Sequence, residues 1–410
     1  MTRPVRVATV IARLEGGAGV LALRGALAVD PDRCAVTIVT GQGDSLIGVA
    51  RAAGLEVVVE PSLRAPIRPA SDLRALRRLQ GLLAGRAFDV VHTHCAKGGA
   101  VGRLAAHRAG AGKIVHTYHG FPFHPFQPRA LREAYIAIER RLGRITDLAL
   151  CVGSGVAAEA VRRELIAPDR VQTIGVCVDG PGRARASRAA GTPAARRRAR
   201  GLLGLHEAGP VVGAVGRLTY QKAPEDLVAA LGILGRPEVT GVWAGSGELT
   251  RNVRQAAART LPGRFVLTGE RADILDILPA FDVLALPSRY EGLPTVVVEA
   301  MICGVPVVAT AVNAVPDLVV PGETGLLVPP RRPARLAAAI GRLLDSPEEA
   351  AALAGAARDR VAGRYDRMAT RNALMKAYGV ETGLSAGPDR SFAEAGQSWP
   401  GLALPQVTGS

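Results

Sequence analysis

Two glutamates on either side of a predicted helix start constrain this chain more than any other feature. They are Glu291 and Glu299, within the stretch S-R-Y-E-G-L-P-T-V-V-V-E-A-M at residues 288–301. The first lies in a loop marked by glycine and proline. The second lies in an apolar segment that begins near Pro294, where a missing N–H is tolerated. Apolar runs precede and follow this segment, which predicts a strand–loop–helix–strand unit of parallel type.

Glu299 is surrounded in the sequence by valine, alanine, methionine and isoleucine, so its helix is expected to be buried. A carboxylate in such a helix must be paired or must face a polar cleft. Spacing alone leaves two interpretations open, a glutamate compensated by a nearby arginine or a carboxylate that binds a vicinal diol such as a ribose. Units of this kind bind ligands beyond the carboxyl end of the strand, facing the helix N-terminus.

The chain has 410 residues, enough for two domains that each bury a full core. Its five cysteines form no C-x-x-C pair, which indicates thiols in a reducing cytoplasm rather than a zinc site or a disulfide framework. No apolar run reaches the length of a membrane span, and the N-terminus enters a strand pattern without signal-peptide architecture. The formal net charge of +15 permits attraction to phosphates or anionic lipid without deciding between them.

Strand-like and helix-like segments alternate along both halves of the chain, which predicts two doubly wound parallel sheets. We expect an N-terminal domain over residues 1–182 and a C-terminal domain over residues 209–378, whose last helix can pack back on the first domain. Residues 183–208, rich in arginine and alanine, are expected to connect the domains with their arginines solvated. No aromatic residues alternate with this charge, so nucleic-acid binding is not indicated. Residues 379–410 are expected to be a disordered tail.

Three features of the first half carry candidate chemistry. Gly16 and Gly17 follow the first predicted strand, where either a tight turn or the approach of a phosphate to backbone N–H groups suits glycine. Histidines cluster in this half at His92, His94, His116, His119 and His124; no carboxylate falls at ligand spacing, so no metal site is expected. The loop 118–126 holds four aromatic residues, and is either pinned to the core or exposed as an apolar wall for an acceptor or a membrane-touching lip.

Polar residues also follow successive strands in the second half. Arg217 and Lys222 bracket a loop before a helix, where a guanidinium fork and an ammonium group suit a diphosphate. The turn G-S-G-E at residues 245–248 follows the next strand, and Arg271 follows the one after it. Because parallel strands end at the same edge of a sheet, we expect these loops and the Glu291 loop to form one site.

These motifs resemble those of the family 4 retaining glycosyltransferases of bacterial type. The resemblance rests on V-G-R-L-x-x-x-K at 215–222, the G-S-G-E turn, the two glutamates eight positions apart, P-G-E-T-G-L-L-V-P-P at 321–330 and H-T-Y-H-G-F-P-F-H at 116–124. It implies the GT-B fold, in which two Rossmann-like domains face a cleft. The N-terminal domain would then take the acceptor and the C-terminal domain the nucleotide-sugar.

The resemblance also implies roles for individual residues. Arg217 and Lys222 would hold the diphosphate, and Arg271 lies where the family contacts the base. Glu299 would bind the ribose hydroxyls, Glu291 the donor sugar, and His119 would face that sugar from the other domain. The expected catalytic residues are His119, Glu291, Arg217 and Lys222. The expected donor-binding residues are Gly16, Gly17, Arg217, Lys222, Arg271, Glu291, Gly292, Leu293, Pro294, Thr295 and Glu299.

Three positions depart from the family pattern. Ala223 stands where glycine usually follows the loop lysine, Asp317 replaces a commoner glutamate, and residues 174–179 replace a common Asn-Gly-Val-Asp. The first departure concerns the phosphate loop and the last concerns the hinge between the domains.

The expected reaction moves a sugar from a UDP- or GDP-sugar to an acceptor with retention of anomeric configuration. Cationic side chains and a helix N-terminus would stabilise the departing diphosphate, so no metal and no cofactor are expected, the nucleotide-sugar being a co-substrate. The acceptor is expected to be a lipid-linked glycan, a polysaccharide precursor or a secondary metabolite. The alternatives are a nucleotide-sugar epimerase of the same fold and a non-catalytic nucleotide-sugar-binding protein. We expect a cytoplasmic protein, with peripheral contact to the inner face of the plasma membrane as an extension of that expectation.

Overall fold

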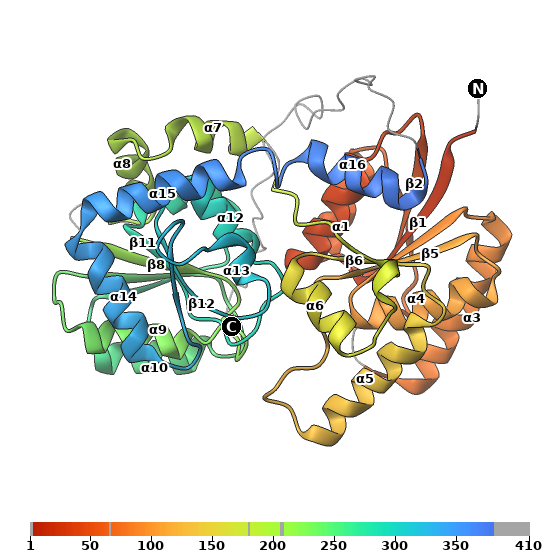
Figure 1. Cartoon of the computed structure of the whole chain (residues 1–410), viewed down its shortest axis with the longest axis horizontal. Coiled ribbons are helices and arrows are strands. Elements are labelled where there is room, and N and C mark those ends of the chain that lie inside the picture. The colour runs from red at the N-terminus through yellow and green to blue at the C-terminus, as the bar shows by residue number, and fades with distance from the viewer. Residues whose placement is uncertain (1–2, 65–66, 179–180, 206–208, 381–410) are drawn as a thin grey trace, which may run out of the picture. The chain divides into compact units, whose positions relative to one another are not determined.

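The chain folds into two compact units in a computed structural model that describes residues 3–64, 67–178, 181–205 and 209–380. The first unit comprises the described residues up to Cys177 and those from Tyr365 onward, and the second runs from Val178 to Arg364 (Figure 1). Both units are built on a parallel sheet with helices, as the alternation of segments predicts.

The first unit contains a seven-stranded parallel sheet with the strand order β3-β2-β1-β4-β5-β6-β7. Its strands are β1 (Val5–Arg13), β2 (Cys34–Gln42), β3 (Glu56–Val59), β4 (Val90–His94), β5 (Lys113–Tyr118), β6 (Leu148–Cys151) and β7 (Val171–Thr173). Its helices are α1 (Gly16–Ala28), α2 (Asp44–Ala52), α3 (Pro69–Arg86), α4 (Ala96–Arg108), α5 (Arg129–Gly143), α6 (Ser154–Arg162), the 3-10 turn Pro168–Arg170, and α16 (Arg367–Tyr378). The three-residue edge strand β7 is too short to show a period in the sequence.

The second unit contains a six-stranded parallel sheet with the strand order β10-β9-β8-β11-β12-β13. Its strands are β8 (Val211–Val215), β9 (Thr240–Ala244), β10 (Phe265–Gly269), β11 (Val283–Leu286), β12 (Val307–Thr310) and β13 (Leu326–Val328). Its helices are α7 (Pro181–Ala189), α8 (Pro193–Leu202), α9 (Pro224–Leu234), α10 (Thr250–Thr260), α11 (Ile274–Ile277), the 3-10 turn η2 (Leu278–Ala280), α12 (Thr295–Ile302), α13 (Val315–Leu318), α14 (Pro333–Asp345) and α15 (Pro347–Val361).

The arginine-rich segment differs from the connection expected over residues 183–208. Helices α7 and α8 occupy it, and within the second unit α7 packs against α11 and α12 while α8 packs against α11 and η2. Its arginines are also not simply solvated, because Arg196 and Arg200 lie 2.5 and 3.0 Å from the carboxylate of Asp282, and Arg185 lies 2.6 Å from Asp276. The chain passes between the units at Cys177 and Val178, and residues 206–208 lie outside the described part.

The last helix, α16, packs against α1 within the first unit, and its Leu374, Met375 and Tyr378 join the core with Val7 and Val115. Gly379 follows this helix in the left-handed conformation typical of a helix C-terminus. The predicted disordered tail falls almost wholly in residues 381–410, which lie outside the described residues.

A buried ion pair fixes α4 and α5 to the first sheet. Arg103 of α4 is 0% exposed and its guanidinium lies 2.7 Å from the carboxylate of Glu139 on α5. The hydroxyl of Tyr118, the last residue of β5, donates to the same carboxylate oxygen at 3.0 Å. Removing one partner of such a pair leaves a buried charge uncompensated, so the three groups act as one unit that holds the end of β5 in place. Among the described residues, no helix combines the length and apolar character that crossing a membrane needs.

Candidate active site

Glu291 and Lys222 form an ion pair at the carboxyl edge of the second sheet. Glu291 lies in the loop between β11 and α12, and Lys222 lies in the loop after β8, the strand that neighbours β11. The Nζ atom of Lys222 lies 2.5 Å from Oε1 of Glu291, and the two side chains are 17% and 5% exposed. The predicted diphosphate-binding and sugar-binding groups are therefore in direct contact in the described structure.

Hydrogen bonds to the backbone of the Glu291 loop hold it from both sides. On the β8 side, the amide N–H of Arg289 donates to the carbonyl of Gln221 at 2.8 Å, and Nε2 of Gln221 donates to the carbonyl of Tyr290 at 3.0 Å. On the β12 side, the hydroxyl of Thr310 donates to the carbonyl of Ser288 at 2.6 Å. The sequence showed no signal for Gln221 or Thr310 because their partners lie far from them along the chain.

The G-S-G-E turn supports the Arg217 loop by close backbone approach. A Cβ atom on Gly247 would lie 2.4 Å from the carbonyl oxygen of Leu218, and one on Gly245 would lie 2.1 Å from that of Gly216. The amide N–H of Leu218 also donates to the carbonyl of Ser246 at 2.9 Å. The two glycines are thus required for packing, since any side chain at these positions would displace the Arg217 loop.

Ala223 adopts the backbone conformation that a glycine would take. It precedes α9 with a φ of +50° and is 0% exposed. A left-handed conformation costs a residue with a Cβ atom roughly 1–2 kcal/mol. The chain therefore keeps the positive φ at this departure from the family pattern and accepts backbone strain next to Lys222.

The other predicted donor-binding residues of the second unit lie around the same edge. Arg217 is exposed, and Glu299 is half-buried in α12, whose other residues after Thr295 are buried. Pro294 caps α12, so that Thr295 is its first residue, one position later than the sequence indicated. Gly292 is half-buried and Leu293 buried in the same loop.

Arg271, in contrast, is engaged locally after β10. It makes two bonds to the carboxylate of Asp273, at 2.8 and 2.5 Å. This hydrogen bonding raises the pKa of Arg271 and lowers the pKa of the Asp273 carboxyl. The guanidinium must leave this partner, or share it, before it can contact a nucleotide base.

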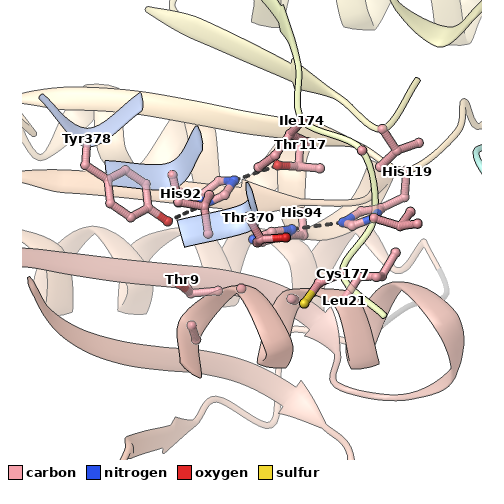
Figure 2. A pocket seen from close by; sticks show the side chains of 17 residues that line it. Thr9, Leu21, His92, His94, Thr117, His119, Ile174, Cys177, Thr370 and Tyr378 are labelled. Carbon is pink, nitrogen blue, oxygen red and sulfur yellow. Dashed lines mark hydrogen bonds between the residues drawn. The ribbon is translucent and has the colours of Figure 1, made fainter. Parts of the chain in front are cut away.

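In the first unit, histidines gather at the carboxyl ends of β4 and β5. Nδ1 of His94 lies 3.0 Å from Nε2 of His119, and His92 lies between two hydroxyls (Figure 2). Those hydroxyls belong to Tyr378 of α16, 2.8 Å from Nδ1, and to Thr117, 2.7 Å from Nε2. The same side chains line a pocket with α1 and the residues 174–177.

Burial keeps these histidines neutral. It lowers the pKa of His92 to about 3 and that of His119 to about 4, and it holds the pKa of His94 well below its usual range. The Nδ1 atom of His119 is buried and has no hydrogen-bond partner among the described residues. No group of histidine, cysteine, aspartate or glutamate side chains in the described residues is arranged to hold a metal ion.

The aromatic loop after β5 is anchored to the core. Tyr118 and Phe123 are 2% and 6% exposed, while Phe121 is half-buried and stacks on Phe123 with ring centroids 4.8 Å apart. Of the two open interpretations, the structure favours the loop pinned by its aromatic side chains. Phe126, further along the loop, is half-buried.

Gly16 and Gly17 lie exposed at the start of α1, and a Cβ atom added at either would meet nothing within 4 Å. The close approach in this turn belongs to Gly19, where a Cβ atom would lie 2.7 Å from the backbone of Leu14. There is therefore space for a ligand above Gly16 and Gly17, whereas packing requires a glycine at position 19.

Comparison with known proteins identifies the family. Residues 15–179 match the family described as Glycosyltransferase Family 4, and residues 209–346 match Glycosyl transferases group 1. A D-inositol 3-phosphate glycosyltransferase of Actinosynnema mirum is 33% identical over 319 residues, covering 71% of this chain and 72% of that protein. The UDP-Gal:alpha-D-GlcNAc-diphosphoundecaprenol alpha-1,3-galactosyltransferase of Escherichia coli is 30% identical over 259 residues, which are 62% of this chain and 65% of that protein. The matched part thus spans just under two thirds of this second relative.

Solved structures show the same fold at lower identity. Anabaena HepE in complex with UDP-glucose superposes with a TM-score of 0.78 at 21% identity, covering 91% of this chain and 99% of that one. The sucrose-phosphate synthase from Thermosynechococcus elongatus gives a TM-score of 0.75 at 22% identity, covering 92% and 98%. With two parallel-sheet Rossmann-like units and both halves matched, the chain belongs to glycosyltransferase family 4, the retaining, nucleotide-sugar-dependent transferases of the GT-B fold.

Proposed function

We propose that the chain transfers a sugar from a UDP-sugar to a glycosyl acceptor, and that the second unit binds this donor. The observation that carries the proposal is the ion pair between Lys222 and Glu291 at the carboxyl edge of the second sheet. Support for uridine comes from the names of similar proteins, a galactosyltransferase that uses UDP-Gal and HepE solved with UDP-glucose.

The proposed donor site places cations at the diphosphate and carboxylates at the hydroxyls of the sugar and the ribose. Departure of the nucleoside diphosphate leaves negative charge on the β-phosphate, which Arg217, Lys222 and the N-terminus of α12 would stabilise. Glu291 would accept hydrogen bonds from sugar hydroxyls, and Glu299 from the ribose diol. Gly292, Leu293, Pro294 and Thr295 would line the path between them, Arg271 would lie near the base, and Gly16 and Gly17 would leave room for the donor at the first unit.

His119 is the proposed catalytic group of the first unit. Its Nδ1 atom has no partner among the described residues, and its depressed pKa keeps the ring uncharged near neutral pH. A nitrogen of a neutral imidazole can donate or accept a hydrogen bond with a sugar hydroxyl without placing a positive charge beside an oxocarbenium-like sugar. His94, bonded to the other ring nitrogen, fixes the orientation of the ring.

A thermal-shift screen of UDP-, GDP- and TDP-sugars on the full chain tests the proposed function. A ligand at a hundred times its dissociation constant stabilises a protein by about 2.7 kcal/mol, so a UDP-sugar should raise the melting temperature most. Transfer assays with the best donor should run equally well with excess chelator, because side chains supply the positive charge. Stabilisation by GDP- or TDP-sugars alone, or activity lost to chelator and restored by magnesium or manganese, would contradict the respective part of the proposal.

The acceptor is proposed to be lipid-linked and to be reached at an anionic membrane surface. On α5, Leu131 and Ile138 are each 46% exposed and lie seven residues apart, on one face of the helix. The same segment also carries exposed arginines, namely Arg129, Arg140 and Arg141 within α5 and Arg144 directly after it. Each basic residue near an anionic surface contributes about 1 kcal/mol, and exposed apolar side chains add to it.

Sedimentation with anionic vesicles at low salt tests this part. We expect binding that falls at high salt, and weaker binding when Leu131 and Ile138 are both changed to serine. Replacing Ile233, an exposed apolar residue of the second unit, with serine is a control that should leave binding unchanged. No binding at low salt would favour a soluble acceptor.

A further inference from the structure

Asn313 makes a contact with Glu291 that no sequence motif suggested. Its Oδ1 atom accepts a hydrogen bond from the backbone N–H of Glu291 at 2.9 Å. The assignment of oxygen rather than nitrogen at this position is firm, because a backbone N–H can only donate. Asn313 lies in the loop between β12 and α13, and β12 is the neighbour of the strand that leads to Glu291.

The backbone of Asn313 is held in a conformation that costs energy. Its φ is +46°, in the left-handed region where glycine is unstrained and asparagine is tolerated better than most other residues. The side chain is exposed, so burial does not account for an asparagine here. Strain that persists at an exposed residue calls for a compensating contact, and the bond to Glu291 is the contact that the described structure provides.

The rest of the loop is secured without Asn313. Thr310 bonds the carbonyl of Ser288, and Gln221 bonds the backbone on the other side at residues 289 and 290. These bonds stop one residue short of Glu291. The asparagine therefore acts on the residue whose carboxylate meets Lys222, and not on the loop as a whole.

We propose that Asn313 is a positioning residue that fixes the backbone of Glu291, so that its carboxylate is presented to the donor sugar beside the Lys222 ammonium. The inference rests on the proposed function, since Glu291 is there assigned to the sugar. It adds a specificity element from the loop after β12 to a sugar-binding region otherwise built from the loops after β8 and β11.

Asn313→Gly separates the hydrogen bond from the backbone conformation. Glycine adopts a positive φ without strain, so the variant keeps the loop conformation, removes the acceptor oxygen and should melt no lower than the wild type. The matched control is Ala87→Gly, which relieves a positive φ of 45° at an exposed residue of the first unit whose side chain has no polar atom.

Hydrogen exchange provides a readout that needs no ligand. In Asn313→Gly the amide of Glu291 should exchange at least about tenfold faster, while Ala87→Gly leaves it unchanged, since a lost hydrogen bond of about 1.4 kcal/mol corresponds to a tenfold change. Unchanged exchange at Glu291 would overturn the positioning role, whatever reaction the protein catalyses.

Binding then tests the link to the sugar. With UDP and UDP-glucose or UDP-galactose as probes, Asn313→Gly should lower the affinity for the nucleotide-sugar by about tenfold and leave the affinity for UDP within about twofold of the wild-type value. In a Glu291→Ala background the same change should have no further effect on the nucleotide-sugar. Equal weakening of UDP and UDP-sugar would overturn the assignment to the sugar. Faster exchange in a protein whose wild type binds none of these probes would instead contradict the proposed function and leave the positioning of Glu291 intact.

Discussion

Lowering the pH from 7.5 to 5.0 is expected to reduce the free energy of unfolding of the first unit by at least about 2 kcal/mol, because three buried histidines must stay neutral in the folded state. His92, His94 and His116 are 3%, 5% and 1% exposed, and burial depresses the pKa of each. In the unfolded chain these groups have pKa values of about 6.5.

The sign follows from the number of protons bound. Between about pH 6.5 and the lower folded-state pKa values, the unfolded state binds more protons than the folded state, so the free energy of unfolding falls as the pH falls. A pH of 5 lies about 1.5 units below the unfolded-state pKa, and His92, whose folded-state pKa is about 3, therefore contributes about 2 kcal/mol at 1.36 kcal/mol per unit. His94 and His116, whose pKa values burial also lowers, act in the same direction.

Hydrogen exchange on the full chain measures this effect with an internal control. Amides of β4 and β5 in the first unit should lose protection at pH 5, after correction for intrinsic rates, while those of β9 around Trp243 in the second unit should keep it. Changing His92 to glutamine should remove one titrating group and reduce the pH slope by up to about 1.4 kcal/mol per unit. Equal loss in both units, or no loss, would contradict the role of the histidines.

Lys222→Ala and Arg217→Ala are each expected to lower turnover by about 10²–10³-fold, as for the loss of one oriented electrostatic donor. Both groups would act on the diphosphate in the ground state and more strongly on the departing one. Steady-state kinetics with the donor identified by thermal shift measure the effect, and calorimetry with UDP measures the ground-state share.

Lys222→Ala also leaves the carboxylate of Glu291 without its cation, and this effect needs a separate control. Glu291 is 5% exposed and would lose its cation, so part of any loss could come from a distorted loop. The double variant Lys222→Ala/Glu291→Gln removes that charge. Turnover should stay low in the double variant if the ammonium acts on the diphosphate. Recovery towards the level of Glu291→Gln alone would contradict it.

Glu291→Gln and Glu299→Gln should have different effects on UDP affinity and on turnover in the same measurements. Glu291→Gln releases Lys222 from its ion pair, so UDP affinity should be retained or increased while turnover falls. Glu299→Gln should weaken UDP binding by about 1–3 kcal/mol, because the variant loses the charge that strengthens hydrogen bonds to the ribose diol. UDP binding lost in Glu291→Gln and kept in Glu299→Gln would reverse the two assignments.

The sequence by itself determined the class of fold and the family. Apolar runs of strand length, alternating with helical periods and broken by glycine and proline, are local signals, and they predicted two doubly wound sheets that the structure contains. The glutamates eight positions apart and the loop from Val215 to Lys222 could also be recognised in the sequence, because each motif lies within one strand–loop–helix unit.

The contacts between those units were decided by the tertiary structure alone. Lys222 meets Glu291 across 69 positions, and His92 meets Tyr378 across 286. Asn313 reaches Glu291 because β11 and β12 are neighbours in the sheet, and the arginines of α8 reach Asp282 because that helix packs on η2. Periodicity reports only on residues a few positions apart, whereas these pairs depend on strand order and on which helix covers which edge. The predicted site residues could thus be found by type and spacing, but the groups that hold them could be found only once the sheet had brought its loops together.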